Sequence, residues 1–204
     1  MVSVYGLSQR SSGPPLLAAP GSLHGHTDLV TSITLCPEFG VSVTASQDRS
    51  VITWDLHSLQ YLHHTLIPAK TSSATLVADI SSKSGEIAVA ADSSLHLFTI
   101  NLKPVCQIAL TERITAVTFS NQEEGVSVNC VAVGLNTGLV KLFSSLDLAL
   151  LRDISGAPAS PVTALTYSED SQNLSVASQD GTLTILEKSG KDGMNKTPKY
   201  ITLQ

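Results

Sequence analysis

The chain has 204 residues, of which 42% are hydrophobic and 14% are charged, and its formal net charge is −5. This composition supplies enough apolar surface for a large buried core, which argues against a disordered chain. The absence of a long basic run argues against binding to nucleic acid or to an anionic membrane surface. No apolar stretch is long enough for a membrane-spanning helix, so we expect no integral membrane segment.

The chain has three cysteines, an odd number, and none of them belongs to a CxxC pair. Disulfide frameworks need paired cysteines and an oxidising compartment, whereas free thiols are typical of reducing compartments. The N-terminus also lacks the charged region and apolar core of a secretory signal. These features predict a cytoplasmic location and buried free thiols at Cys36, Cys106 and Cys130.

The N-terminal segment, residues 1–22, is rich in Ser, Gly and Pro and shows little hydrophobic periodicity. This composition predicts a loop-rich segment, with one short strand at residues 2–5. In residues 23–204, short runs of alternating apolar and polar residues dominate, which is the period-2 pattern of strands on a pleated sheet. We divide this part into four repeats, at approximately residues 24–66, 67–110, 111–154 and 155–204.

Each repeat begins with a strand in which Thr or Ser alternates with apolar residues, as in VTSITL, ITAVTF and VTALTY. These first strands are expected at residues 30–35, 76–80, 114–119 and 162–167. Second, more apolar strands are expected at residues 41–45, 86–90, 130–133 and 174–177. Turns rich in Asp, Asn and Gly come next, and third strands follow at residues 51–54, 95–99, 139–143 and 183–186. Fourth, outer strands are expected at residues 61–66, 104–110, 149–154 and 200–203.

Aligned residues close each third strand every 43–45 residues, at Trp54, Phe98, Phe143 and Leu186. A period of about 40–45 residues with a Gly-His start and a Trp-Asp end is the signature of WD40 repeats, each of which forms a four-stranded blade. The sequence therefore predicts an all-β, WD40-type β-propeller of about four blades. Four such blades leave apolar faces unpaired at both ends. We therefore expect an open or partial propeller, completed by upstream blades in cis or by self-association.

The first repeat resembles the WD40 motif most closely. In that family a His before the first strand, a Ser or Thr in the second strand, an Asp in the turn and a Trp in the third strand form a buried hydrogen-bond network. The carboxylate accepts from the imidazole, which reaches a hydroxyl that meets the indole N–H. The resemblance implies a structural tetrad of His26, Thr44, Asp48 and Trp54. Phe or Leu replaces the Trp in the other repeats, whose blades are expected to depend on packing.

The third repeat carries a more specific resemblance. Residues 119–129, FSNQEEGVSVN, and residues 134–142, GLNTGLVKL, are similar to the C-terminal propeller of BEACH-domain proteins. The segments WDLHSL at residues 54–59 and SGEI at residues 84–87 fit the same family, and the resemblance covers roughly residues 23–203. It implies a role in vesicle and lysosome-related trafficking, with a PH-like and a BEACH domain upstream. On this resemblance we expect a C-terminal piece of a larger protein or a truncated product.

No residue pattern favours catalysis or metal binding. His57, His63 and His64 lie close together in the sequence, but no Cys or acidic ligand stands at a recognised spacing from them. Asp48 and His26 resemble two members of a catalytic triad, but the third candidate, Thr44, falls inside a packed strand instead of on an exposed turn. We therefore expect no enzyme activity, no metal and no cofactor.

The expected function is a non-catalytic scaffold whose partners are other proteins, together with the upstream BEACH domain and blades in cis. Exposed polar residues beside rigid strands suit recognition, and the candidate partner-binding residues are Gln47, Arg113 and Gln179. Peripheral association with vesicle or lysosome-related membranes would occur through partners. Two alternatives remain: a generic WD40 adaptor, such as a ligase substrate receptor, and a propeller enzyme with acids and bases converging on its channel.

Overall fold

The computed structural model describes residues 2–4, 7–8, 16–17, 21–68, 75–122, 129–154, 160–187 and 199–202. Within these residues the protein consists of β-strands and one short 3₁₀ turn, η1 (Pro37–Phe39). Most of the strands form four antiparallel sheets of four strands each. The predicted all-β fold with four propeller-like blades is therefore confirmed.

Each blade contains four consecutive strands, ordered along the sheet as they are in the sequence. Blade 1 consists of β5 (Val30–Cys36), β6 (Val41–Ser46), β7 (Ser50–Asp55) and β8 (Tyr61–Leu66). Blade 2 consists of β9 (Leu76–Ile80), β10 (Ile87–Ala91), β11 (Ser94–Phe98) and β12 (Pro104–Ala109). Blade 3 consists of β13 (Ile114–Phe119), β14 (Cys130–Leu135), β15 (Val140–Ser144) and β16 (Leu150–Ile154). Blade 4 consists of β17 (Val162–Tyr167), β18 (Asn173–Ser178), β19 (Thr182–Glu187) and β20 (Lys199–Thr202).

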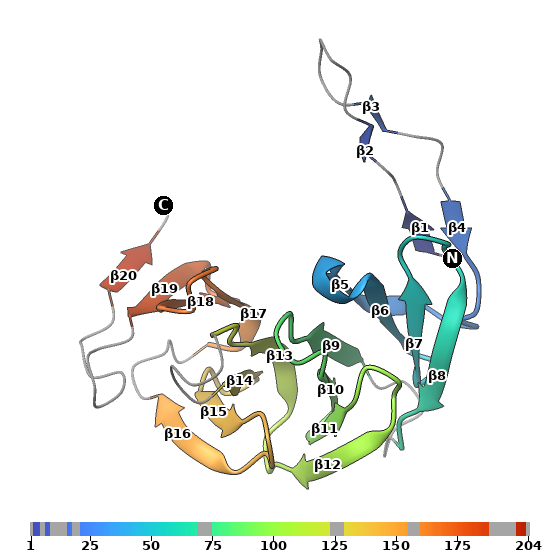
Figure 1. The fold of residues 1–204 in the computed structure, drawn as a ribbon. Helices are drawn as coiled ribbons and strands as arrows, with labels where there is room; N and C mark the ends of the chain where they lie inside the picture. Colours follow the sequence, from blue (N-terminus) through green and yellow to red (C-terminus); the bar gives the residue numbers. More distant parts are fainter. Residues whose placement is uncertain are drawn as a thin grey trace.

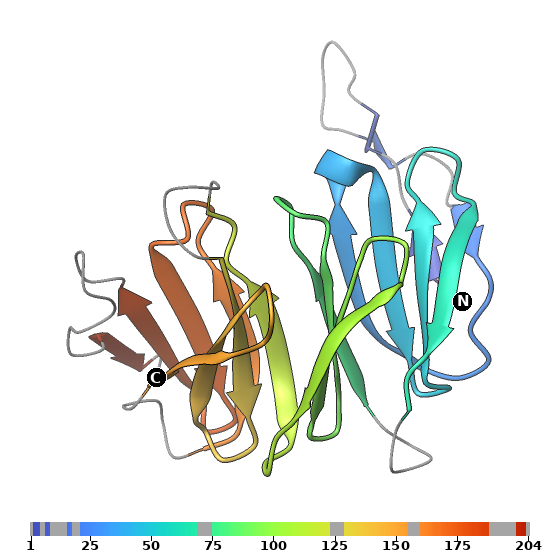
Figure 2. The ribbon, with the colours of Figure 1, turned by 60° about the horizontal axis from the view of Figure 1, so that its bottom comes forward.

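The four blades form an arc, with blade 1 at one end and blade 4 at the other (Figure 1). The first strands β5, β9, β13 and β17 lie on the inner side of the arc and are in contact from one blade to the next. The last strands lie on the outer side. Figure 2 shows the same sheets standing side by side as separate layers.

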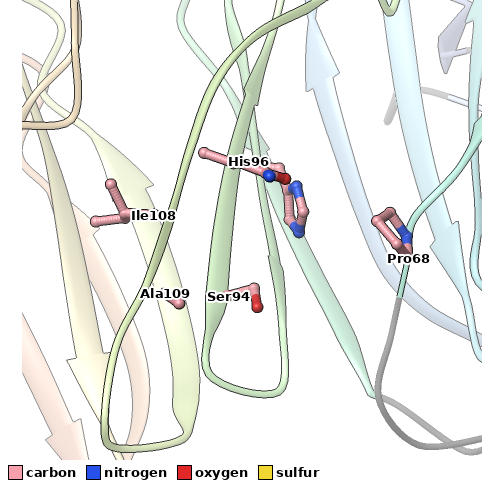
Figure 3. A pocket seen from close by; sticks show the side chains of 6 residues that line it. Pro68, Ser94, His96, Ile108 and Ala109 are labelled. Carbon is pink, nitrogen blue, oxygen red and sulfur yellow. The ribbon is translucent and has the colours of Figure 1, made fainter.

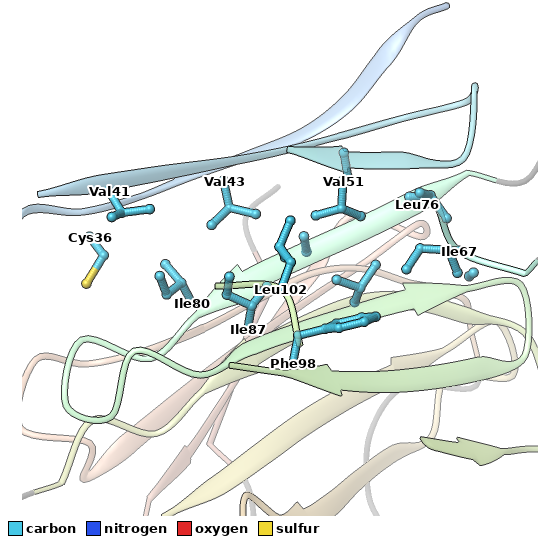
Figure 4. Packing of buried hydrophobic residues seen from close by; sticks show 14 residues of the cluster. Cys36, Val41, Val43, Val51, Ile67, Leu76, Ile80, Ile87, Phe98 and Leu102 are labelled. Carbon is cyan, nitrogen blue, oxygen red and sulfur yellow. The ribbon is translucent and has the colours of Figure 1, made fainter. Parts of the chain in front are cut away.

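Apolar layers fill the space between neighbouring blades. Between blades 1 and 2, Val43 and Val51 pack against Ile87 and Phe98 (Figure 4). Similar layers lie between blades 2 and 3 and between blades 3 and 4. Because neighbouring blades bury their faces against one another, the core is a series of stacked layers, as in other repeat proteins.

A β-bulge interrupts the first strand of three blades at the same place. The pairing of the first strand with the second shifts around Thr31, Thr115 and Thr163. In blade 1 the hydroxyl of the bulged Thr31 donates to the carbonyl of Leu76 in blade 2, at 2.6 Å. A bulge re-aims the side chain of its extra residue, and here it directs a hydroxyl towards the next blade.

The N-terminal strands cover part of the free face of blade 1. β1 (Val2–Val4) pairs with β4 (Gly21–Leu23), while β2 (Leu7–Ser8) pairs with β3 (Leu16–Leu17). Val2 and Leu23 join Ile52 and Trp54 in one buried cluster. The free face is therefore partly covered, whereas the terminal position of blade 1 predicts a fully exposed face.

All three cysteines are free, as predicted. Cys36 is buried, but Cys106 and Cys130 are only partly buried, so the prediction of three buried thiols is wrong for two of them. The reason is their place in the sheets: Cys106 lies on the outer strand β12, and Cys130 is the first residue of β14.

Candidate functional site

Asp48 lies in the tight turn between β6 and β7 and accepts hydrogen bonds from two backbone N–H groups. Its carboxylate accepts the N–H of Thr27 at 2.6 Å and the N–H of Ser50 at 2.8 Å. Arg49 has a φ of 68°, a left-handed conformation that few non-glycine residues adopt. The side chain of Asp48 is 12% exposed, so the carboxylate is largely withdrawn from solvent.

His26 lies between Thr44 and Ser50. Its Nε2 atom is 2.7 Å from Oγ1 of Thr44, and its Nδ1 atom is 2.6 Å from Oγ of Ser50. Oγ1 of Thr44 also accepts the indole N–H of Trp54 at 2.8 Å, and the hydroxyl of Ser50 donates to Oδ1 of Asp48. The other carboxylate oxygen, Oδ2, lies 3.6 Å from Nδ1 of His26, which is too far for a good hydrogen bond. The four predicted residues thus lie together, with Ser50 as a bridge between Asp48 and His26.

A neutral imidazole with its proton on Nδ1 satisfies each contact of His26. Ser50 uses its hydroxyl proton on Asp48, so it must accept the N–H at Nδ1 of His26. Nε2 of His26 then carries a lone pair and accepts the hydroxyl proton of Thr44, which itself accepts from Trp54. A doubly protonated ring fits the same partners, because Thr44 can accept from Nε2 and donate to the carbonyl of Ile52 at 3.5 Å. The contacts therefore fix the proton on Nδ1 alone.

The electrostatics of the site favour the neutral form of His26. Burial lowers the pKa of His26 below its ordinary value, although the charge of Asp48 and hydrogen bonding to it act in the opposite direction. For Asp48, partial burial raises the pKa, but hydrogen bonds from the Ser50 hydroxyl and from the N–H groups of Thr27 and Ser50 outweigh burial and hold the pKa well below its usual range. At neutral pH, Asp48 is ionised and His26 is neutral.

The sequence-based prediction does not include Ser50. A usable signal exists, because Ser or Thr follows Asp after one intervening residue in three repeats, at Asp48-Arg49-Ser50, Asp92-Ser93-Ser94 and Asp180-Gly181-Thr182. In blade 4 the N–H and the hydroxyl of Thr182 both donate to Oδ1 of Asp180, at 2.9 and 2.7 Å. This spacing indicates a Ser or Thr whose hydroxyl donates to the Asp carboxylate two residues earlier and so closes the turn.

The predicted partner-binding residues Gln47, Arg113 and Gln179 lie at the same end of their blades, where first strands begin and second strands end. The N–H groups of Gln47 and Gln179 donate to the carbonyl that precedes the first strand of their own blade, at 2.8 and 2.9 Å. Arg113 holds that preceding position in blade 3, where its carbonyl accepts the N–H of Asn136 at 3.0 Å. We call this end of the arc the turn rim.

The turn rim is polar and partly exposed. Arg113 and Gln179 are exposed, whereas Gln47 is half-buried. The guanidinium of Arg113 donates to Oγ1 of Thr75 at 3.3 Å, across the gap between blades 3 and 2. The rim therefore spans several blades with side chains whose backbone is fixed by hydrogen bonds.

The histidines considered as metal ligands do not converge. His57 lies in the turn after β7, and His63 and His64 are neighbours on β8, so their side chains point to opposite faces of the sheet. In the described part of the chain no group of three or more His, Cys, Asp or Glu side chains is close enough to hold a metal ion. Within the same residues no helix is long and apolar enough to cross a membrane.

A pocket of about 260 Å³ lies between Pro68, just after blade 1, and the outer strands of blade 2 (Figure 3). His96 lines it, is 6% exposed, and stacks on Phe98 with ring centroids 6.2 Å apart. Nε2 of His96 has no hydrogen-bond partner among the described residues. Burial lowers the pKa of His96, although its hydrogen bond with Gln107 opposes this. The pocket is smaller than the roughly 300–1,000 Å³ of small-molecule sites, and we assign it no ligand.

Comparison with known families agrees with this geometry. Two segments, residues 19–55 and 149–185, match the sequence model of the family described as WD domain, G-beta repeat. The first segment contains β5 to β7 with the preceding His26, and the second runs from β16 to β19. Together with the four antiparallel sheets, these matches identify the chain as a WD40-repeat protein.

Three relatives narrow the family to which this WD40-repeat chain is similar. The human lysosomal-trafficking regulator is 37% identical over 167 residues, which cover 79% of this chain and 4% of that protein. The lysosomal-trafficking regulator of Drosophila melanogaster is 25% identical over 239 residues, covering 92% of this chain and 6% of that protein. The WD repeat- and FYVE domain-containing protein 4 of Mus musculus is 27% identical over 172 residues, which cover 79% of this chain and 5% of that protein. These relatives are BEACH proteins, so the predicted resemblance is confirmed. The chain spans only 4% to 6% of their length.

Two solved structures share the fold. A computationally designed protein, Ika4, superposes with a TM-score of 0.63 at 22% identity, over 81% of this chain and 95% of that chain. The β-propeller domain of Cps50 (Swd1) from Myceliophteria thermophila superposes with a TM-score of 0.68 at 17% identity, over 91% of this chain and 60% of that chain. At these identities the likeness shows the propeller architecture alone.

Proposed function

We propose that this chain is a non-catalytic scaffold that binds other proteins through its turn rim, with Gln47, Arg113 and Gln179 among the contact residues. The observation that carries the proposal is the repetition of one backbone geometry on three blades. Each of these residues is held by a backbone hydrogen bond of 2.8, 3.0 or 2.9 Å. A backbone that is already fixed loses little freedom on binding, which favours recognition.

The residues that resemble a catalytic triad have structural partners instead. Thr44 is fully buried, and its hydroxyl oxygen already contacts both His26 and Trp54. A nucleophile must reach its substrate, and this hydroxyl is enclosed. The burial of Thr44 therefore supports a structural role for the tetrad over a catalytic one.

The relatives support a role in vesicle and lysosome-related trafficking. Two of them carry the name lysosomal-trafficking regulator, and on this basis we propose a cytoplasmic protein that reaches such membranes peripherally, through its partners. An upstream BEACH domain and further blades would act with it in cis. The alternative of a generic WD40 adaptor, such as a ligase substrate receptor, is supported by the WD domain match alone. A propeller enzyme has less support than either.

Affinity capture from cell extract tests the scaffold. The bait is the full chain, and the comparison is a variant that carries Gln47→Glu, Arg113→Glu and Gln179→Glu. Added negative charge at an interface disturbs electrostatic complementarity, so we expect specific partners to be recovered about tenfold less well, equivalent to about 1.4 kcal/mol. Quantitative mass spectrometry reports the recovery.

A matched control makes the same change of charge at the opposite end of the blades. Gln60, Lys103 and Gln172 are exposed and lie in the loops before β8, β12 and β18. The variant Gln60→Glu, Lys103→Glu, Gln172→Glu should retain every partner. Equal losses in the two variants, or no loss in the turn-rim variant, would contradict the proposal.

A further inference from the structure

The outer strand of blade 1 has an unprotected edge. β8 has the sequence YLHHTL, without Lys, Arg, Asp, Glu or Pro, and nearly all of its residues are exposed. The apolar side chains of Tyr61 and Leu66 are 53% and 62% exposed. Within the described residues β8 pairs with β7 alone. Natural proteins usually block such edges with charge or Pro, because an unpaired strand attracts another strand.

The other outer strands described with their side chains do carry such protection. β12 begins with Pro104, which has no N–H to donate. β16 contains Arg152 and Asp153, and Asp153 forms an ion pair with Lys141 at 3.3 Å. Among the three outer strands described with their side chains, β8 is therefore the one that has neither a charged residue nor Pro.

The register of blade 1 shows which backbone groups face outward. Ile67 donates its N–H to the carbonyl of Arg49 at 2.9 Å, and the pairs Val51 with Thr65 and Thr53 with His63 continue in the same register. Hydrogen-bonded pairs alternate with non-hydrogen-bonded pairs in an antiparallel ladder. His64 and Leu66 occupy the alternate positions, so their N–H and C=O groups point away from β7.

The side chains beside these groups are held in place. The ring of Tyr61 makes an edge-to-face contact with Trp54, with centroids 6.1 Å apart and planes at 87°. Such contacts favour a fixed ring position, and Trp54 is itself fixed by its hydrogen bond to Thr44. The edge is thus a preorganised row of backbone donors and acceptors flanked by apolar side chains.

We propose that an extended segment of a partner protein pairs with β8 as a fifth strand of blade 1. Backbone hydrogen bonds to His64 and Leu66 would supply affinity, and apolar residues at alternate positions would lie beside Tyr61 and Leu66. The segment is uncharged or basic, because β8 carries no formal charge and the whole chain has a net charge of −5. A second copy of this chain is the competing occupant, and the dependence of protection on protein concentration tests it.

This inference rests on the proposed function only in that the ligand is a protein segment. The surface is separate from the turn rim, and its test uses none of the turn-rim variants. Failure of one proposal therefore leaves the other standing.

Amide hydrogen exchange followed by NMR tests the pairing. The probe is a short capped peptide that alternates Val with Thr and has Lys at each end, added to saturation. We expect exchange at His64 and Leu66 to slow at least about tenfold. The control peptide has the same sequence with alternate backbone nitrogens methylated, which removes half of its donors. Protection that is equal with both peptides, or absent with both, would overturn the proposal.

Substitutions locate the site. Leu66→Lys adds a charge to the edge, and His64→Pro removes an N–H that points outward and is not needed by the blade. Both should abolish protection by the peptide while the cooperative thermal melt is retained. Val105→Lys on β12, at a side chain that is 46% exposed, should have no effect. The proposal fails if Val105→Lys weakens binding as much as Leu66→Lys, or if His64 and Leu66 become protected with rising protein concentration alone.

Discussion

Asp79 in blade 2 accepts the backbone N–H of Phe119 in blade 3 at 2.9 Å. Its other carboxylate oxygen accepts the hydroxyl of Thr34 in blade 1 at 3.1 Å. One side chain therefore connects the innermost strands of three blades. Burial raises the pKa of Asp79, although hydrogen bonds from the N–H groups of Phe119 and Ile80 and from the Thr34 hydroxyl act in the opposite direction. The link thus places an acid in a partly buried position, where a neutral acceptor would cost less.

The Asp79 link can be tested with two variants that differ in one acceptor. Asp79→Leu leaves the N–H of Phe119 without a partner, so we expect a loss of about 1–3 kcal/mol in the free energy of unfolding. Asp79→Asn keeps a carbonyl acceptor and removes the buried charge, so its stability at neutral pH should remain close to that of the parent. Urea denaturation measures both values. A loss in Asp79→Asn as large as that in Asp79→Leu would show that the acceptor is not the important feature.

The network around His26 should stabilise blade 1. Asp48→Ala removes the acceptor of the Ser50 hydroxyl and of two backbone N–H groups, and we expect it to lower stability by about 1–3 kcal/mol. Asp180→Ala is the matched control, because Asp180 accepts the same turn bonds from Thr182 on a blade where Leu186 stands in place of Trp54. It should lower the melting temperature less. An unchanged melting temperature for soluble Asp48→Ala would contradict a structural role for the tetrad.

Stability should decrease as the pH falls below the ordinary histidine pKa of about 6.5. Burial lowers the pKa of both His26 and His96 in the folded protein. Below about pH 6.5 the unfolded chain therefore binds protons that the folded chain does not, which favours unfolding. The decrease ends once the pH passes the folded-state pKa values. Each histidine can contribute up to about 1.4 kcal/mol per pH unit within this window.

The variant His96→Phe isolates one of these contributions. Phe keeps a ring to stack on Phe98 and cannot bind a proton, so urea denaturation from about pH 7 to about pH 5 should show a shallower decrease than in the parent. His63→Phe, at an exposed position of β8, serves as the control for loss of a histidine. An equal decrease in the parent and in His96→Phe would show that burial of His96 is not linked to protonation.

The repeat pattern was sufficient to predict the strands but not the details of their pairing. Every predicted strand of the four blades lies within two residues of an observed one, because alternation of apolar and polar residues follows directly from the pleat. The bulges at Thr31, Thr115 and Thr163 were not predicted. A bulge adds a single residue and leaves the alternation on either side intact, so its only trace in the sequence is the Thr repeated at that position.

The same limit applies to the polar network. The family motif indicates that His26, Thr44, Asp48 and Trp54 lie near one another, but it does not give the path of the protons between them. Ser50 stands between Asp48 and His26 because the left-handed Arg49 folds the turn back onto the carboxylate. The packing of Val2 and Leu23 with Trp54 could not be predicted from the sequence either, because short strands far apart in the chain share no periodic pattern.

The uncovered part of the free face of blade 1 should make the isolated chain self-associate. Leu29, Ile33 and Leu35 are 62%, 52% and 57% exposed, and Ile33 and Leu35 lie on the innermost strand, where the other blades meet their neighbours. Exposed apolar groups of this kind mark interaction sites or aggregation liabilities. Size-exclusion chromatography with light scattering should therefore show a mass that rises with concentration, together with binding of a hydrophobic dye.

Substitution of this patch should reverse the association without unfolding the blade. The double variant Ile33→Thr, Leu35→Thr removes apolar surface while keeping residues that favour strands, so we expect association to weaken by about tenfold or more and the melt to stay cooperative. Leu150→Thr, at a side chain that is 52% exposed on β16, is the control and should associate like the parent. A parent chain that stays monomeric at all concentrations and binds no dye would contradict the prediction. The exposed apolar patch on blade 1 would then not be an interface.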